Sequence, residues 1–223
     1  VVQYFFFYVG LAHTTGVKGS IVEASNVFLA ILVSSLIFHQ EKLDQKKVLG
    51  CIVGFAGVVL INLSGSNVDM SFNLTGDGFI FISAIAYALS SVLIKKYSAK
   101  SDPVMLSGYQ FTAGGLMMIL IGSVMGGRIH TASMPAMILL IYMALISAVA
   151  YTLWGILLEY NPVSKVSIFG FTNPVFGVIL SAIILREGNV FGMKDLIALV
   201  LVSIGILIVN WAKPGTGKEK GTN

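Results

Sequence analysis

The chain has 223 residues, of which 56% are hydrophobic and only 11% are charged, and its mean hydropathy is +0.89. A soluble domain carries about 25% charged residues, so this composition excludes an ordinary water-covered surface and indicates the lipid bilayer as the solvent. The net charge of +4 is spread singly or in short groups between apolar runs, which excludes a nucleic-acid-binding patch.

Apolar runs of membrane-spanning length recur along the whole chain. A membrane helix needs about 20 mostly apolar residues. The opening run is about half that length, and we expect it to be the second half of a helix. Longer runs predict transmembrane helices at 19–38, 47–64, 77–95, 104–125, 135–158, 165–185 and 193–212. The Gly- and Lys-rich segment 213–223 predicts a disordered cytoplasmic tail.

The distribution of Lys and Arg predicts the orientation of these helices. With the tail in the cytoplasm, ten basic residues fall in inner loops and four in outer loops, which accounts for all 14. Inner loops of membrane proteins are enriched in Lys and Arg, so we expect a multi-pass protein with a cytoplasmic C-terminus. The short loops favour a bacterial cytoplasmic membrane.

Two parts of the chain resemble each other, namely residues 1–62 and residues 148–210. At an offset of 147, four pairs of identical residues coincide: Tyr4 with Tyr151, Lys18 with Lys165, Ser20 with Ser167, and Asn26 with Asn173. Both copies close in Gly-x-x-x-x-Asn, which places Gly57 on Gly205. Fixed internal self-similarity of this kind indicates a duplicated architecture.

The positions of the two copies predict an inverted repeat. Two further helices separate them, so a complete unit has five helices, and an odd number turns the second copy over relative to the first. We therefore predict an all-α, polytopic transmembrane bundle with ten helices in the full protein and about seven and a half here. Residues 1–64 are the C-terminal part of the first repeat, and residues 77–212 are the complete second repeat. Inverted repeats that meet at a midplane site are typical of secondary transporters.

Several segments resemble the EamA family of the drug/metabolite transporter superfamily. They are GFIFISAIAYALSSVLIKKY (78–97), SDPVMLSGYQFTAGGLMMIL (101–120), NPVFGVILSAIILREG (173–188), NVFLAILVSSLIFHQEKL (26–43) and the closing GVVLIN and GILIVN. The resemblance implies ten helices, both termini in the cytoplasm, and export of small metabolites or amino acids. The first copy has Val27 where the second has Pro174, so its helix lacks the matching kink.

Small and polar residues share one face of the run 19–38 and of its counterpart 165–185. In the first copy they are Gly19, Glu23, Asn26, Ala30 and Ser34, and in the second copy they are Val166, Gly170, Asn173, Gly177 and Ser181. This face is either a seam where helices pack closely or the lining of a central pathway.

Glu23 is the acidic residue that falls clearly inside a predicted span. Carboxylates within the membrane are costly and are functional candidates, so we predict Glu23 as a proton or cation coupling site. Alternatively, it lies one turn inside the helix start, where water reaches it and the helix dipole favours a negative charge.

The candidate substrate-binding residues are the symmetric pair Asn26 and Asn173 with the aromatic residues Tyr4, Tyr151 and Trp154. The amides suit hydrogen bonding to a substrate, and the rings suit an amphipathic one. The alternative for the amides is bonding between helices, and for the rings it is an interface belt or helix packing. Pro174 predicts a helix kink that frees a carbonyl near Gly170.

Other features carry less chemistry. Gly108, Gly115 and Gly122 predict a close-packing stripe, and Glu41 and Glu187 are interpreted as loop and helix-terminus residues. The histidines lack the spacing of metal ligands, and the sequence has no catalytic, nucleotide or cofactor motif. We therefore expect a transporter whose partners are the bilayer, a small molecule and protons, and not an enzyme. The alternatives are a membrane scaffold or receptor subunit, a facilitator, or a small-drug exporter.

Overall fold

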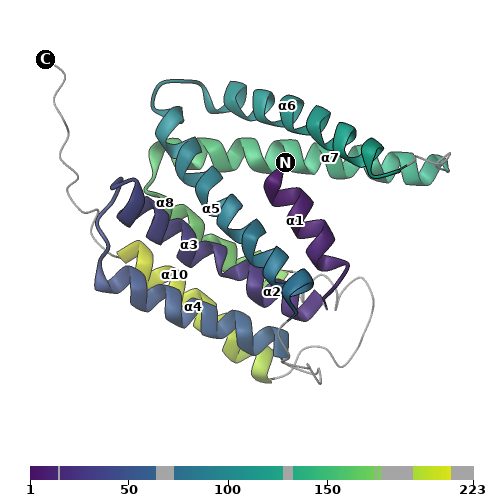
Figure 1. Ribbon diagram of the computed structural model, residues 1–223. Helices are drawn as coiled ribbons and strands as arrows, with labels where there is room; N and C mark the ends of the chain where they lie inside the picture. Colours follow the sequence, from purple (N-terminus) through teal and green to yellow (C-terminus); the bar gives the residue numbers. More distant parts are fainter. Residues whose placement is uncertain (15, 64–72, 128–132, 174, 177–192, 212–223) are drawn as a thin grey trace, which may run out of the picture. The chain divides into compact units, whose positions relative to one another are not determined.

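A computed structural model of this protein describes residues 1–14, 16–63, 73–127, 133–173, 175–176 and 193–211, which are mostly helical (Figure 1). The predicted all-α class is confirmed for the part of the chain that the structure describes. The predicted tail 213–223 lies outside those residues. The chain forms two compact units, one of Val1 with Leu93–Asn161 and a larger one of Val2–Val92 with Pro162–Asn223.

The helices agree with the apolar runs of the sequence to within a few residues. Their bounds are α1 Val2–Leu11, α2 Gly16–Ala24, α3 Asn26–Leu32, the π-helix η1 Val33–Ile37, α4 Gln45–Leu63, the π-helix η2 Leu74–Gly78, α5 Phe79–Ser98, α6 Pro103–Val124, α7 Met134–Tyr160, α8 Val163–Ser167, the 3-10 helix η3 Ile168–Phe171 and α10 Met193–Trp211.

Four described helical stretches are long and apolar enough to cross a membrane: Lys18–Ile37, Leu74–Ser98, Pro103–Val124 and Met134–Tyr160. They coincide with four of the predicted spans. The predicted span 165–185 is described only at its beginning.

The unit of Leu93–Asn161 is built by α6 and α7 together with the end of α5. The Asp102 carboxylate caps α6 by accepting the backbone N–H of Val104 at 2.7 Å. At the same end of the unit, Lys95 Nζ donates to the carbonyl of Glu159 in the last turn of α7, at 2.8 Å. A cation at a helix C-terminus also interacts favourably with the helix dipole.

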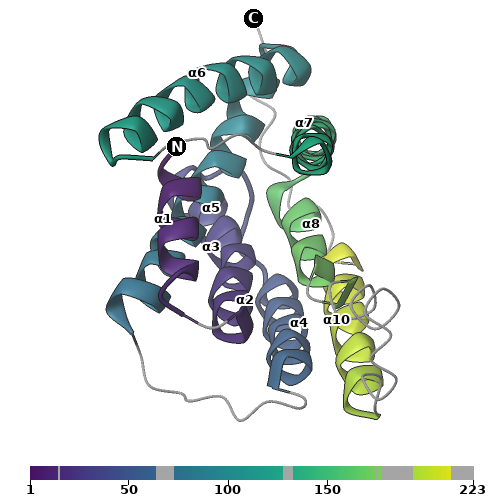
Figure 2. The same ribbon diagram turned by 90° about the vertical axis from the view of Figure 1, so that its right-hand side faces the viewer.

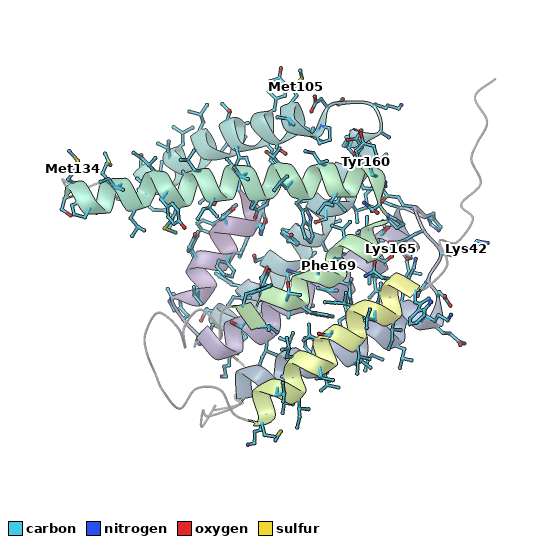
Figure 3. All side chains as sticks on the ribbon, turned by 180° about the vertical axis from the view of Figure 1, so that it is seen from behind. Lys42, Met105, Met134, Tyr160, Lys165 and Phe169 are labelled. Carbon is cyan, nitrogen blue, oxygen red and sulfur yellow. The ribbon has the colours of Figure 1, made fainter. Side chains whose placement is uncertain are left out.

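Most side chains on α6 and α7 are apolar and exposed. Met105, Met134 and Tyr160, labelled in Figure 3, are 59%, 76% and 75% exposed. Such a surface would be unfavourable in water, whereas lipid is its natural environment. An added Cβ at Gly108 or Gly115 meets no atom of this unit within 4 Å, so the predicted glycine stripe finds no support in the packing of the unit.

The larger unit is organised around α4 and α10, which lie side by side in Figures 1 and 2. An added Cβ at Gly50 would lie 2.8 Å from the carbonyl oxygen of Gly205, and one at Gly57 would lie 2.8 Å from the carbonyl oxygen of Ala198. Residue numbers thus rise along one helix as they fall along the other, so the two helices are antiparallel. Small residues allow this close approach of membrane helices.

These contacts have the symmetry of an inverted repeat. Gly57 and Gly205 are equivalent at an offset of 148 residues, and at this offset Gly50 is equivalent to Ala198. The contact of Gly50 with Gly205 therefore has a symmetric counterpart in the contact of Ala198 with Gly57, and both contacts are present. In the same way the contact of Gly57 with Val202 corresponds to that of Gly205 with Gly54. A pair of helices related by a two-fold axis makes each contact twice, which is the pattern found here.

Phe171 in η3 closes the core beside this helix pair. Its side chain is fully buried and lies where a Cβ at Gly54 would overlap its ring. The rings of Phe28 and Phe55 lie 6.4 and 6.5 Å from it. The glycine on α4 therefore provides the space that an aromatic residue from the second copy fills.

Replacing Gly205 by Ala is expected to lower the free energy of unfolding by about 1–3 kcal/mol, because the added Cβ would overlap the backbone of α4 and not a movable side chain. The matched control is Gly115→Ala on α6, which gains the same helix propensity in open space. Thermal unfolding of the purified protein in one detergent compares them. Equal unfolding midpoints would contradict the close contact of α4 with α10.

Candidate functional site

The span Lys18–Ile37 is not a regular α-helix. Its helical hydrogen bonding tightens at Ser25, where the backbone N–H bonds to the carbonyl of Val22 at 3.0 Å, and this turn separates α2 from α3. The last residues of the span form the π-helix η1. Departures from α-helical bonding often mark functional positions in membrane helices, and here one of them lies between Glu23 and Asn26.

Glu23 and Asn26 form a polar pair on either side of this turn. Asn26 Nδ2 donates to Glu23 Oε1 at 3.4 Å, a long hydrogen bond. The other carboxylate oxygen, Oε2, is buried and has no hydrogen-bond partner among the described residues. A buried carboxylate with an unused acceptor is energetically unfavourable, so the site is suited to a proton or a cationic group.

Tyr87 of α5 extends the pair into a cluster. Its hydroxyl bonds to the side chain of Ser91, and it lies within electrostatic range of Glu23 and of Tyr4. The Tyr4 ring is stacked on Tyr8, with centroids 6.1 Å apart. Of the predicted residues, Glu23 and Asn26 are therefore bonded to each other, and Tyr4 and Glu23 both lie within electrostatic range of Tyr87 in the larger unit.

Sequence reasoning missed Tyr87 and Ser91. A usable signal was present, since Ser83, Tyr87 and Ser91 recur every four residues along α5 and so share one helix face. Ser83 and Ser91 are buried at 0% and 2% exposure. A polar stripe in an apolar helix that is buried inside the protein is a candidate lining of a polar site.

The second copy approaches the pair through Gly170 in η3. A Cβ at Gly170 would lie 3.3 Å from the side chain of Val27 and 3.8 Å from Asn26 Oδ1. Gly170 is the repeat equivalent of Glu23, and it lies against Asn26, the partner of Glu23, and not against Glu23 itself. Asn173 follows on the same segment and is exposed. Pro174 lies outside the described residues. The 3-10 geometry of η3 ends at Phe171, before Thr172 and Asn173.

Tyr151 and Trp154 belong to α7 in the smaller unit, which is described by itself. The Tyr151 ring packs edge-on against Phe111 of α6, with centroids 5.2 Å apart. Both side chains are half-buried. Their predicted place in a shared cavity with Tyr4 remains a prediction.

The predicted small-residue face is partly a packing seam. Gly19 packs against Ile80 and Leu11, and Ala30 and Ser34 are fully buried. In the second copy Val166 is also buried, while Gly177 and Ser181 lie outside the described residues. The close-packed part of the face therefore flanks the polar pair and holds it in position.

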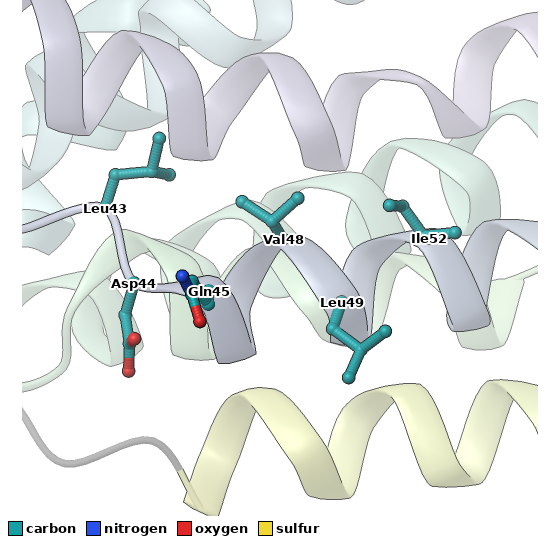
Figure 4. A pocket seen from close by; sticks show the side chains of 6 residues that line it. All are labelled: Leu43, Asp44, Gln45, Val48, Leu49 and Ile52. Atoms are coloured by element: carbon teal, nitrogen blue, oxygen red, sulfur yellow. The ribbon is translucent and has the colours of Figure 1, made fainter.

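A groove of about 360 Å³ lies elsewhere, along the start of α4 (Figure 4). Its lining is mainly apolar, with Leu43, Val48, Leu49 and Ile52 beside Asp44 and Gln45. Because it holds no buried polar group that could orient a solute, the groove resembles a lipid-facing surface more than a binding site. Among the described residues no group of three or more His, Cys, Asp or Glu side chains is placed to hold a metal ion.

Comparisons with known proteins agree on one family. The family model described as the EamA-like transporter family matches residues 1–63 and 74–211. The chain is 26% identical over 211 residues to a WAT1-related chloroplast protein of Arabidopsis thaliana, covering 91% of this chain and 50% of that protein. It is 27% identical over 207 residues to the uncharacterized transporter YyaM of Bacillus subtilis, covering 90% of this chain and 66% of that protein.

A third relative is an uncharacterized transporter of Methanothermobacter thermautotrophicus, 28% identical over 220 residues, covering 92% of this chain and 60% of that protein. The chain thus spans between half and two thirds of the length of these relatives. One crystal structure of another protein matches with a TM-score of 0.77 at 16% identity, covering 94% of this chain and 73% of that chain. At this identity the likeness shows the fold alone.

The unused oxygen of Glu23 predicts an unusual response to mutation. Glu23→Gln is expected to leave the free energy of unfolding unchanged or to raise it, because the variant removes a charge from an apolar span. Glu41→Gln is the matched comparison, since Glu41 accepts from Lys47 Nζ at 2.6 Å and from Ser164 Oγ at 2.5 Å. Glu41→Gln is expected to lower the free energy of unfolding by about 3 kcal/mol, because the buried Lys47 loses its charge partner.

Thermal unfolding of both Glu→Gln variants in one detergent measures this difference. A destabilisation by Glu23→Gln as large as that by Glu41→Gln would mean that Glu23 is a structural residue.

Proposed function

Since the chain belongs to the EamA-like transporter family, we propose that the full-length protein is a secondary active transporter that exports small metabolites or amino acids by alternating access. The observation that carries this proposal is the buried Glu23 Oε2, which lacks a hydrogen-bond partner among the described residues of its span. A group kept in this unfavourable state inside a membrane helix is typical of a coupling or substrate site.

Glu23 is the proposed coupling residue. When the site faces one side of the membrane the carboxylate takes up a proton or another cation, and it releases this ion on the other side. Asn26 donates to the carboxylate at 3.4 Å, so the amide orients Glu23 while Oε2 stays available to the ion. With the nearby Tyr87 hydroxyl, the site offers donors and acceptors in an otherwise apolar span.

The proposed substrate cavity combines residues of both copies. Asn26 and Tyr4 come from the first copy, and Asn173, Tyr151 and Trp154 come from the second. The amides and phenol groups suit the polar groups of a metabolite or amino acid, and the rings suit its apolar part. The shared cluster of Tyr4, Tyr87 and Glu23 supports this assignment for the first copy.

The inverted arrangement supplies a physical basis for alternating access. Two copies of one fold in opposite orientation can exchange conformations, which gives two states of similar energy that open to opposite sides. The paired contacts between α4 and α10 support such a relation between residues 1–64 and 77–212. We place the transporter in the cytoplasmic membrane of a bacterium, as a multi-pass protein with its C-terminus in the cytoplasm.

The direct experiment measures uptake of labelled amino acids and small metabolites by inside-out vesicles that contain the full-length protein, with and without a pH gradient. We expect one class of solute to accumulate and its accumulation to collapse with the gradient. Absence of uptake across the panel by folded protein would contradict metabolite export.

Glu23→Gln is expected to lower gradient-driven uptake at least tenfold, because the amide binds no proton in this pH range. Solute exchange without a gradient should remain intact. The matched control is Glu159→Gln, at the end of α7 and outside the polar cluster, for which uptake should be unchanged. Gradient-driven uptake by Glu23→Gln equal to that of the unmodified protein would remove Glu23 from the mechanism.

A further inference from the structure

The span Lys18–Ile37 has a buried carboxylate contact at each of its ends. A helix of 20 residues is about 30 Å long, which matches the hydrocarbon thickness of a bilayer. Asp77 is bound to the start of this span, and Glu41 follows shortly after its end. The two contacts therefore lie toward opposite sides of the membrane.

The first of these, the Asp77 contact, fixes the segment that leads into the span. Asp77 is 4% exposed. Its Oδ1 accepts a hydrogen bond from Thr14 Oγ1 at 2.5 Å, and its Oδ2 lies 3.9 Å from Lys18 Nζ. Nearby, Asn73 Nδ2 donates to the carbonyl of His13 at 3.0 Å. These bonds join the first predicted repeat to the start of the second.

The second, the Glu41 contact, joins the two repeats at the other end. Glu41 Oε1 accepts the backbone N–H of Ser164 at 2.9 Å, and Oε2 accepts from Ser164 Oγ at 2.5 Å and from Lys47 Nζ at 2.6 Å. The side chains of Glu41 and Lys47 are each 6% exposed. Figure 3 labels Lys42 and Lys165, which are the chain neighbours of Glu41 and Ser164.

We propose that Asp77 and Glu41 are the positioning residues of two gates, and that each gate opens when its contact breaks while the other contact holds. This inference rests on the alternating access of the proposed function. Glu41 has partners in both predicted repeats, and Asp77, at the start of the second repeat, is bonded to Thr14 and Lys18 of the first. Separation of the repeats at one end must therefore remove some of those partners. Among the described residues, the hydrogen bonds of Asp77 and Glu41 do not involve Glu23 or Asn26.

The energetics of buried charge explain why the two contacts alternate. A carboxylate that loses its donors must be hydrated instead, and water reaches it only when that end of the protein opens. Weakening one contact therefore favours the conformation that is open at that end. A change that stabilises one of two states by a given free energy shifts their ratio by the corresponding factor.

Two isosteric or near-isosteric substitutions weaken the gates separately. Thr14→Val and Ser164→Ala each delete one hydroxyl that donates to a carboxylate. Each is expected to shift the ratio of the two conformations about tenfold, in opposite directions. The double variant should return the ratio toward that of the unmodified protein. The matched control is Ser203→Ala, because the Ser203 hydroxyl donates within its own helix, to the carbonyl of Leu199.

Electron–electron double resonance measures the distance between two spin labels at each end of the span, in the full-length protein in lipid nanodiscs. One label pair replaces Ala12 and Leu74, at the Asp77 end, and the other replaces Lys42 and Lys165, at the Glu41 end. Cys51 is replaced by Ala so that labelling is specific. Thr14→Val should increase the fraction of long distances in the first pair and decrease it in the second, and Ser164→Ala should do the reverse.

Opposite shifts that cancel in the double variant support the gates. Shifts in the same direction, or unchanged distances with a lowered unfolding temperature, would mean that the contacts only stabilise the fold and would overturn the inference. The distance measurement needs no substrate, so failure of the vesicle assay leaves its result intact. Transport without these shifts would in turn reject the gates and keep the proposed function.

Discussion

The close approach of α4 to α10 is the constraint on which the larger unit depends. Gly205 lies so near the backbone of Gly50 and Gly54 that a single methyl group would overlap it. Gly54, which takes part in this approach, also leaves the space into which Phe171 of η3 fits, and η3 is the segment that brings Gly170 to Asn26. Since lipid offers no hydrophobic driving force between helices, such packing must supply the association energy itself.

The bilayer explains how much of this fold the sequence could predict. Long apolar runs have little choice but to form helices in lipid, and the predicted runs 77–95, 104–125 and 135–158 coincide with described spans to within a few residues. The equivalence of Gly57 and Gly205 was also visible in the repeat. The partner of Gly205 was not, because periodicity within one helix does not specify which backbone will lie against it.

The candidate site could be predicted only where its residues lie close together in the sequence. Glu23 and Asn26 are close in sequence, so the geometry of one helix brings them together. Tyr87 comes within electrostatic range of Glu23 from α5, more than 60 positions along the chain, and only tertiary packing brings it there. Glu41 was interpreted as a loop and helix-terminus residue, but its partner Ser164, 123 residues away, could not be inferred from local sequence.

The three carboxylates along the span Lys18–Ile37 differ in how well they are satisfied. Asp77 and Glu41, at its two ends, are each bonded to a hydroxyl and paired with a lysine. Glu23, between them, has one long bond and one oxygen without a partner among the described residues. A protein that satisfies the end groups fully can tolerate the unfavourable middle group, because the ends stabilise the helix that carries it. In the mechanism proposed above, the unsatisfied carboxylate is the one that takes up the ion, and the satisfied carboxylates are those whose bonds break when the protein opens at either end.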